Sequence, residues 1–156
     1  VRHLLDGPWD EPTARQKLVR RIEWNDLAGP SGAVSLVVEH AGVPVGDVIL
    51  WLTNRERGVA EIGWVLHPAH GGHGFAREAV AEVLRIAFEH HRLHRVVAQM
   101  DARNRPSARL ASAVGMRQEA HLRQDWWNKG EWTDTLIFAS LLDDPRPPVL
   151  DVNRPT

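Results

Sequence analysis

A glycine-rich loop between a predicted strand and a long predicted helix constrains the fold of this chain more than any other feature. The loop is His67-Pro68-Ala69-His70-Gly71-Gly72-His73-Gly74-Phe75-Ala76. Val59 to Leu66 is predicted as a strand, and apolar residues recur at helical spacing from His73 to His91. Backbone N–H groups at a helix start point outward and carry partial positive charge, and glycine lets an anion approach closely. The segment therefore indicates a main-chain site for a pyrophosphate, although a tight turn without a ligand stays open.

The sequence does not match two other glycine-rich motifs that bind phosphate groups. A nucleotide P-loop needs a Lys followed by Ser or Thr, which this loop lacks. A dinucleotide fingerprint that began at Gly72 or Gly74 would need its third glycine at Arg77 or Ala79.

The remaining predicted elements place this unit in an α+β chain. We expect two strands before the loop to form an antiparallel meander with Val59 to Leu66. Met116 to Gln124 alternates in polarity and predicts a half-buried strand. The other elements are a helix at Pro12 to Trp24, strands at Ala33 to Glu39 and Val45 to Thr53, a strand at Arg95 to Met100, a helix at Arg105 to Val114 and a strand at Trp132 to Leu142.

Length and composition predict a single domain at residues 1–142, followed by a loosely held Pro-rich tail at residues 143–156. Lys plus Arg total 19 against 20 Asp plus Glu, so nucleic-acid binding lacks its usual electrostatic basis. The chain has no cysteine, which excludes disulfides, thiolate catalysis and Cys-containing zinc sites and favours the cytoplasm. We expect no membrane association, because no apolar run approaches about 18 residues. The chain opens on Val1, which leaves open whether it is processed, cut or missing an upstream piece.

Several motifs in order resemble the GNAT superfamily of acetyltransferases, and within it the RimJ/RimL-like branch. The family loop has the form Gln/Arg-x-x-Gly-x-Gly/Ala, and here Gly74 and Ala76 match while Gly71 stands where Gln or Arg is usual. The further matching motifs are Ala60-Glu61-Ile62-Gly63-Trp64, Glu78-Ala79-Val80, Asn104-Arg105-Pro106-Ser107, Val114-Gly115-Met116 and Trp132-Thr133-Asp134. The resemblance runs from Val1 to Leu142 and implies a GNAT-type mixed, mostly antiparallel sheet flanked by helices. We expect the first strand and helix that relatives usually carry to be absent from this sequence.

The resemblance implies that acetyl-CoA is the co-substrate and that its acetyl group passes directly to an amine. No protein nucleophile is then needed. The implied acetyl-CoA-binding residues are Leu66, which would pair with the pantetheine arm, the loop Gly71, Gly72, His73, Gly74, Phe75 and Ala76, and Asn104 and Ser107.

Three residues are candidate catalytic groups. Glu61 is the first candidate for the base that takes the amine proton and Asp134 the second, with a solvated or salt-bridged role equally open for each. Many relatives use Tyr to protonate the CoA thiolate, and this chain has none, so we expect Ser107 to donate a hydrogen bond instead. Ser107 also fits a plain first-turn residue, and Asn104 also fits a helix N-cap.

Other chemistries fit less well. His67, His70 and His73 straddle a Pro and two glycines without a carboxylate, so no metal site is expected. Trp126, Trp127 and Trp132 fit an acceptor pocket, a core or a subunit interface, and a homodimer is one expectation. The acceptor stays open among a protein N-terminus, an antibiotic or polyamine amine, and an amino acid. The alternative function is a non-catalytic acyl-CoA-binding or scaffold protein with the same fold.

Overall fold

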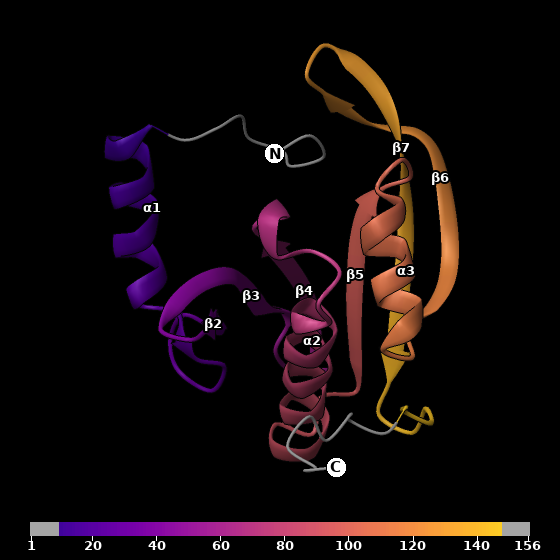
Figure 1. Cartoon of the computed structure of the whole chain (residues 1–156). Coiled ribbons are helices and arrows are strands. Elements are labelled where there is room, and N and C mark those ends of the chain that lie inside the picture. The colour runs from indigo at the N-terminus through magenta and orange to yellow at the C-terminus, as the bar shows by residue number, and fades with distance from the viewer. Residues whose placement is uncertain (1–9, 148–156) are drawn as a thin grey trace, which may run out of the picture.

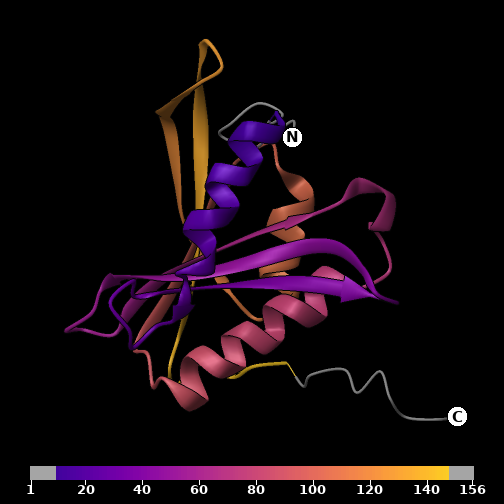
Figure 2. The same cartoon turned by 90° about the vertical axis from the view of Figure 1, so that its left-hand side faces the viewer.

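The computed structural model describes residues 10–147, which form a seven-stranded sheet with helices on both faces (Figures 1 and 2). The strand order across the sheet is β1-β2-β3-β4-β5-β7-β6. In chain order the elements are α1 (Glu11–Ile22), β1 (Asn25–Asp26), β2 (Ala33–His40), β3 (Val43–Asn54), β4 (Val59–Leu66), a 3₁₀ turn (Pro68–His70), α2 (Phe75–Arg85), a π-helical turn (Ile86–His90), β5 (Arg95–Asp101), α3 (Arg105–Ala113), β6 (Arg117–Asn128) and β7 (Glu131–Leu141).

The pairing of β4 with β5 is the only parallel contact in the described sheet. It covers residues 59–61 of β4 and 95–97 of β5, after which the two strands no longer pair with each other, while β4 stays paired with β3 up to Leu66 and β5 with β7 up to Asp101. The two strands therefore diverge toward the end of the sheet that carries the glycine-rich loop. The predicted α+β fold with a mostly antiparallel sheet is confirmed.

The two faces of the sheet carry different helices. Figure 2 shows α1 on one side of the strands and α2 on the other, and an ion pair between Arg21 and Asp47 ties α1 to β3. Buried residues of α2, of the π-helical turn and of α3, namely Leu84, Phe88 and Ala111, belong to one core cluster with Ile62 of β4. No helix within residues 10–147 combines the length and apolarity that a membrane span requires.

The long helix predicted at His73 to His91 is shorter than expected at both ends. Gly74 precedes α2 with a φ of 86°, a left-handed conformation that no helical residue adopts. At the other end the α-helix stops at Arg85, and the N–H of His91 bonds the carbonyl of Ile86, five residues back. The apolar spacing continues through this π-helical turn, so the sequence pattern did not reveal the change.

The strand predicted at Met116 to Gln124 is present as β6, but the prediction that it is half-buried is wrong. β6 is an edge strand that is exposed along almost all of its length and runs on to Asn128. Its register with β7 shifts between Gln118 and Ala120 and again between Leu122 and Trp126. These bulges interrupt the alternation of faces on which the prediction depended.

The expectation of a loosely held tail is wrong for residues 143–147. Arg146 donates to the carbonyl oxygens of Leu141 and Leu142 at 3.2 and 2.8 Å, and its guanidinium lies 4.0 Å from the centre of the Phe88 ring. Pro147 packs against Gly115. The rest of the predicted tail lies outside the described residues.

Candidate active site

A cleft of about 480 Å³ lies beside the end of β4, beyond its parallel pairing with β5. It reaches from the end of β4, past the glycine-rich loop, to the first turns of α2 and α3. Its lining residues are Trp64, Val65, Leu66, His67, Pro68, Gly71, Gly72, Gly74, Ala76, Arg77, Asn104, Pro106, Ser107 and Leu110.

The glycine-rich loop presents unbonded backbone N–H groups beside this cleft. Gly72 and Gly74 have φ of 85° and 86°, which glycine adopts without strain. No atom lies within 4 Å of a Cβ placed on either, so backbone conformation rather than lack of space favours glycine at both positions. The first helical bond of α2 runs from Glu78 to the carbonyl of Gly74. Within the described chain, the N–H groups of residues 72–77 have no hydrogen-bond acceptor. These groups can therefore bind an anion.

Gly71 differs from the rest of the predicted loop site. Its N–H donates to the carbonyl of Pro68 at 3.1 Å, which closes the short 3₁₀ turn. The main-chain donors open to a ligand therefore begin at Gly72 rather than at Gly71.

The start of α3 forms the opposite side of the cleft. The side-chain oxygen of Asn104 accepts a hydrogen bond from the Ser107 N–H at 3.2 Å, which confirms Asn104 as the N-cap. Both residues also line the cleft. The cap therefore fixes where these two polar side chains stand relative to the loop.

Substitutions at Asn104 are expected to separate its capping role from a binding role. Asn104→Ala should lower the free energy of unfolding by about 1 kcal/mol, whereas Asn104→Ser retains a capping oxygen and should cost little. Because the Asn104 amide also borders the cleft, both variants should weaken acetyl-CoA binding. Thermal unfolding and calorimetric titration measure the two effects, and an unchanged affinity in Asn104→Ser would remove Asn104 from the binding site.

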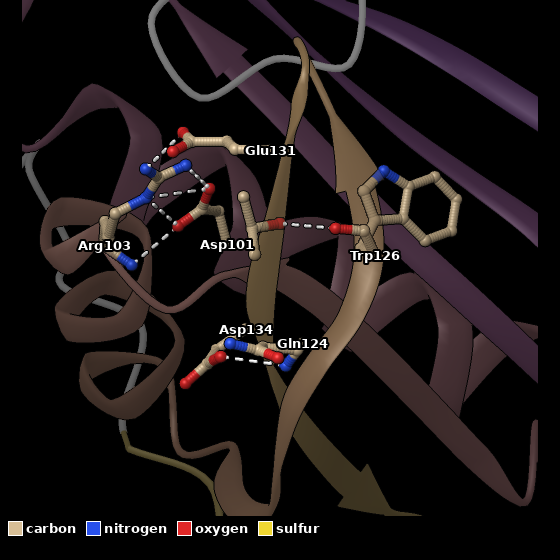
Figure 3. A network of polar contacts seen from close by, with 7 residues as sticks. Asp101, Arg103, Gln124, Trp126, Glu131 and Asp134 are labelled. Atoms are coloured by element: carbon tan, nitrogen blue, oxygen red, sulfur yellow. Dashed lines mark hydrogen bonds and ion pairs between the residues drawn. The ribbon is translucent and has the colours of Figure 1, made fainter.

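An ion-pair network supports the loop that leads into α3 (Figure 3). Arg103 pairs with the buried carboxylate of Asp101 and with Glu131 of the β6–β7 hairpin, each at 2.7 Å. No sequence motif revealed this network, because Arg103 and Glu131 are far apart in the chain. It joins the end of β5, the start of α3 and the hairpin, and so braces the position of Asn104.

Glu61 is the last β4 residue paired with β5, opposite Val97. Its neighbours Ala60 and Ile62 are buried in the core, so alternation along the strand points Glu61 to the face opposite α2. Gln99 donates to its carboxylate at 3.2 Å. Burial raises the pKa of Glu61, and the bond from Gln99 offsets part of that rise. A carboxylate with a raised pKa is a better general base, though Glu61 does not line the cleft described above.

Asp134 of β7 is held by two partners and lies away from the cleft lining. It accepts from the Gln124 N–H at 2.9 Å, shown in Figure 3, and pairs with the His121 ring at 2.7 Å. The bond from the Gln124 backbone, followed by that from His121, lowers the pKa of Asp134. Asp134 is therefore the weaker base of the two candidates.

The structure brings most of the predicted acetyl-CoA residues together. The predicted residues that line the cleft are Leu66, Gly71, Gly72, Gly74, Ala76, Asn104 and Ser107. His73 and Phe75 do not line it. The most informative residue that sequence reasoning missed is Arg77, although it directly follows the matched motif.

A core role for the predicted tryptophans and a metal site at the histidines find no support in the described residues. Trp126, Trp127 and Trp132 are 48%, 58% and 56% exposed, so the interpretation as core residues is wrong. Among residues 10–147, no group of three or more His, Cys, Asp or Glu side chains is arranged to hold a metal ion. The absence of a metal, the acceptor-pocket role of the tryptophans and the homodimer stay predictions.

Comparison with known proteins identifies the family. Residues 1–117 match the family model described as an acetyltransferase (GNAT) domain. The chain belongs to the GNAT family of acetyltransferases. This confirms the predicted enzyme class and the family named from the sequence motifs.

Two curated relatives of this GNAT chain agree with that assignment. It is 28% identical to the uncharacterized N-acetyltransferase p20 of Bacillus licheniformis, over 86% of this chain and 75% of p20. It is 34% identical to the uncharacterized N-acetyltransferase YnaD of Bacillus subtilis over 54% of this chain, a match that spans only 49% of YnaD.

Two solved structures share the fold. A GNAT-family acetyltransferase from Bacillus anthracis superposes with a TM-score of 0.78 at 24% identity, covering 92% of this chain and 81% of that one. A spermidine N-acetyltransferase from Vibrio cholerae, in complex with CoA and spermine, superposes with a TM-score of 0.74 at 21% identity, covering 91% and 82%.

Proposed function

We propose that this chain transfers the acetyl group of acetyl-CoA directly to a primary amine, either a protein N-terminus or the amine of a small molecule. The observation that carries the proposal is the run of N–H groups at residues 72–77 that have no acceptor within residues 10–147, next to a cleft bordered by Asn104 and Ser107. These donors suit a pyrophosphate, and the divergence of β4 from β5 leaves room for a thioester beyond it.

The transfer requires the amine to be positioned against the thioester, a base to take the amine proton, and a hydrogen bond to the departing sulfur. The neutral amine nitrogen attacks the thioester carbon, the C–N bond forms as the C–S bond breaks, and the CoA thiolate leaves. Glu61 takes the amine proton, directly or through water, since burial raises the pKa of its carboxyl. Among the described residues that line the cleft, only Ser107 carries a hydroxyl, and it donates a hydrogen bond to the departing sulfur. Asp134 is the second candidate base.

The motif order favours the RimJ/RimL-like branch within the family, and with it a protein N-terminus as acceptor. The CoA and spermine complex of the structural neighbour from Vibrio cholerae favours a polyamine instead. Both acceptors present a primary amine, which is the group that the proposed transfer requires. The cytoplasmic location expected from the cysteine-free sequence and the lack of a nucleic-acid partner stay predictions.

A thiol-release assay tests the proposed function. Purified protein is mixed with acetyl-CoA and, in turn, with spermine, N-terminal peptides and amino acids, and free CoA thiol is measured. We expect release that depends on the acceptor and on protein concentration. Tight acetyl-CoA binding without release for any acceptor would contradict the proposal and support the alternative, a non-catalytic acyl-CoA-binding protein. The lack of any Tyr in the chain is the feature that favours this alternative.

A further inference from the structure

The residues that the structure describes around the cleft include a single permanent charge. Among its described lining residues, Arg77 is the only Lys or Arg, and no Asp or Glu is present. His67 also lines the cleft, but its Nδ1 accepts a hydrogen bond from the Ala69 N–H at 3.3 Å. The cleft therefore offers one unopposed cation to whatever it binds.

Arg77 is partly buried and has no partner within the described chain. It forms no hydrogen bond or ion pair there, and the residues three and four positions away on either side carry no carboxylate. Arg85 on the same helix differs, because Glu82 and Glu89 bind it at 2.6 and 2.8 Å. A guanidinium that borders a cleft without a counter-charge is available to pair with an anionic group of a ligand.

The position of Arg77 indicates which ligand group that is. Arg77 lies in the first turn of α2, at the end of the run of N–H groups, residues 72–77, that have no acceptor within the described chain. Gly71, at the other end of the loop, lines the cleft with no side chain at all. A guanidinium binds phosphate through a planar fork of donors.

We propose that Arg77 binds a phosphate group of CoA and supplies the side-chain charge that Gly71 cannot. This inference rests on the proposed function, since it assumes a CoA ligand. The group is either the pyrophosphate or the 3′-phosphate, and both offer the same oxygen acceptors.

A panel of ligands and variants tests the proposal. CoA, 3′-dephospho-CoA and pantetheine are titrated calorimetrically into the wild type and Arg77→Met, which keeps much of the apolar stem. We expect the Kd for CoA to rise about tenfold to a hundredfold in Arg77→Met, with pantetheine unaffected. Arg109→Met is the matched control, because Arg109 is an exposed arginine of α3 that does not line the cleft.

A second variant tests whether an arginine at position 71 restores CoA binding. Gly71 has an extended backbone with a φ of −67°, which any residue adopts, and a Cβ there would meet only the Pro68 carbonyl oxygen at 3.3 Å. Gly71→Arg in the Arg77→Met background is expected to recover part of the lost CoA affinity.

Each outcome of the panel is decisive. A loss that persists for 3′-dephospho-CoA assigns Arg77 to the pyrophosphate, and a loss that vanishes assigns it to the 3′-phosphate. An unchanged Kd for CoA in Arg77→Met overturns the inference, and so does an equal loss for pantetheine, which would show a structural effect. Failure of the wild type to bind CoA at all would overturn the proposed function together with the inference.

Discussion

Replacing Glu61 by Gln is expected to lower kcat by about 10²- to 10⁴-fold, because the variant loses the carboxylate that takes the proton from the attacking amine. Gln is close in size to Glu, and its amide can still meet Gln99, the present hydrogen-bond partner. The KM for acetyl-CoA should change little, since Glu61 lies outside the lining of the cleft. Steady-state kinetics with the best acceptor measures both quantities.

The pKa of Glu61 sets the pH dependence of this effect. Burial raises that pKa, so the base ionises at a higher pH than an exposed glutamate, and kcat/KM should rise with pH through that value. This rising limb should disappear in Glu61→Gln. A carboxyl whose pKa is higher in the folded state costs folding free energy at any pH above both pKa values and costs nothing below both. Glu61→Gln should therefore be at least as stable as the wild type at neutral pH.

Glu56→Gln is the control for this variant, because Glu56 is an exposed residue of the turn between β3 and β4. It should leave kcat unchanged. A kcat for Glu61→Gln within about twofold of the wild type would exclude Glu61 as the base, and Asp134→Asn would then become the variant to measure.

Replacing Gly74 by Val is expected to weaken acetyl-CoA binding by about a hundredfold. Gly74 has a φ of 86°, which a β-branched residue adopts only with strain, so the variant shifts the loop and its N–H groups. Losing one or two hydrogen bonds to a charged phosphate costs about 1.5–3 kcal/mol each, which corresponds to roughly tenfold or more in Kd. Calorimetric titration with acetyl-CoA measures the change.

Gly130→Val separates backbone strain from ligand binding. Gly130 lies in the β6–β7 turn with a φ of 85°, and, as at Gly74, a Cβ added there would have no atom within 4 Å. The strain in the two variants is therefore alike, and both should lose stability. Only Gly74→Val should lose affinity, and a similar loss in both would show that strain alone weakens binding.

The parts of the fold that local sequence rules govern could be predicted. β4 runs from Val59 to Leu66 as expected, because a polar turn precedes it and the glycine-rich loop follows it. The N-cap at Asn104 was also predictable, since an Asn before a first-turn Pro is a local signal. The Asn128–Glu131 hairpin turn also depends on local chemistry, because its two central residues, Lys129 and Gly130, both have positive φ, which Gly adopts without strain.

The parts that depend on distant contacts could not be predicted. The bulges of β6 depend on its pairing with β7, and the packing of Arg146 on Phe88 joins segments far apart in the chain. The partners of Arg103 likewise became visible only in three dimensions. In the candidate site, sequence motifs supplied the loop and the Asn104 cap, whereas the lack of a partner for Arg77 among residues 10–147 became visible only in three dimensions.

Amide resonances of the glycine-rich loop test the central claim most directly. On titration with CoA, the N–H groups of residues 72–77 should shift and become protected from hydrogen exchange, while that of Gly71, already bonded to Pro68, should keep its present protection. Tight binding of CoA with no shift and no protection at residues 72–77 would contradict the account, since the phosphates would then lie elsewhere.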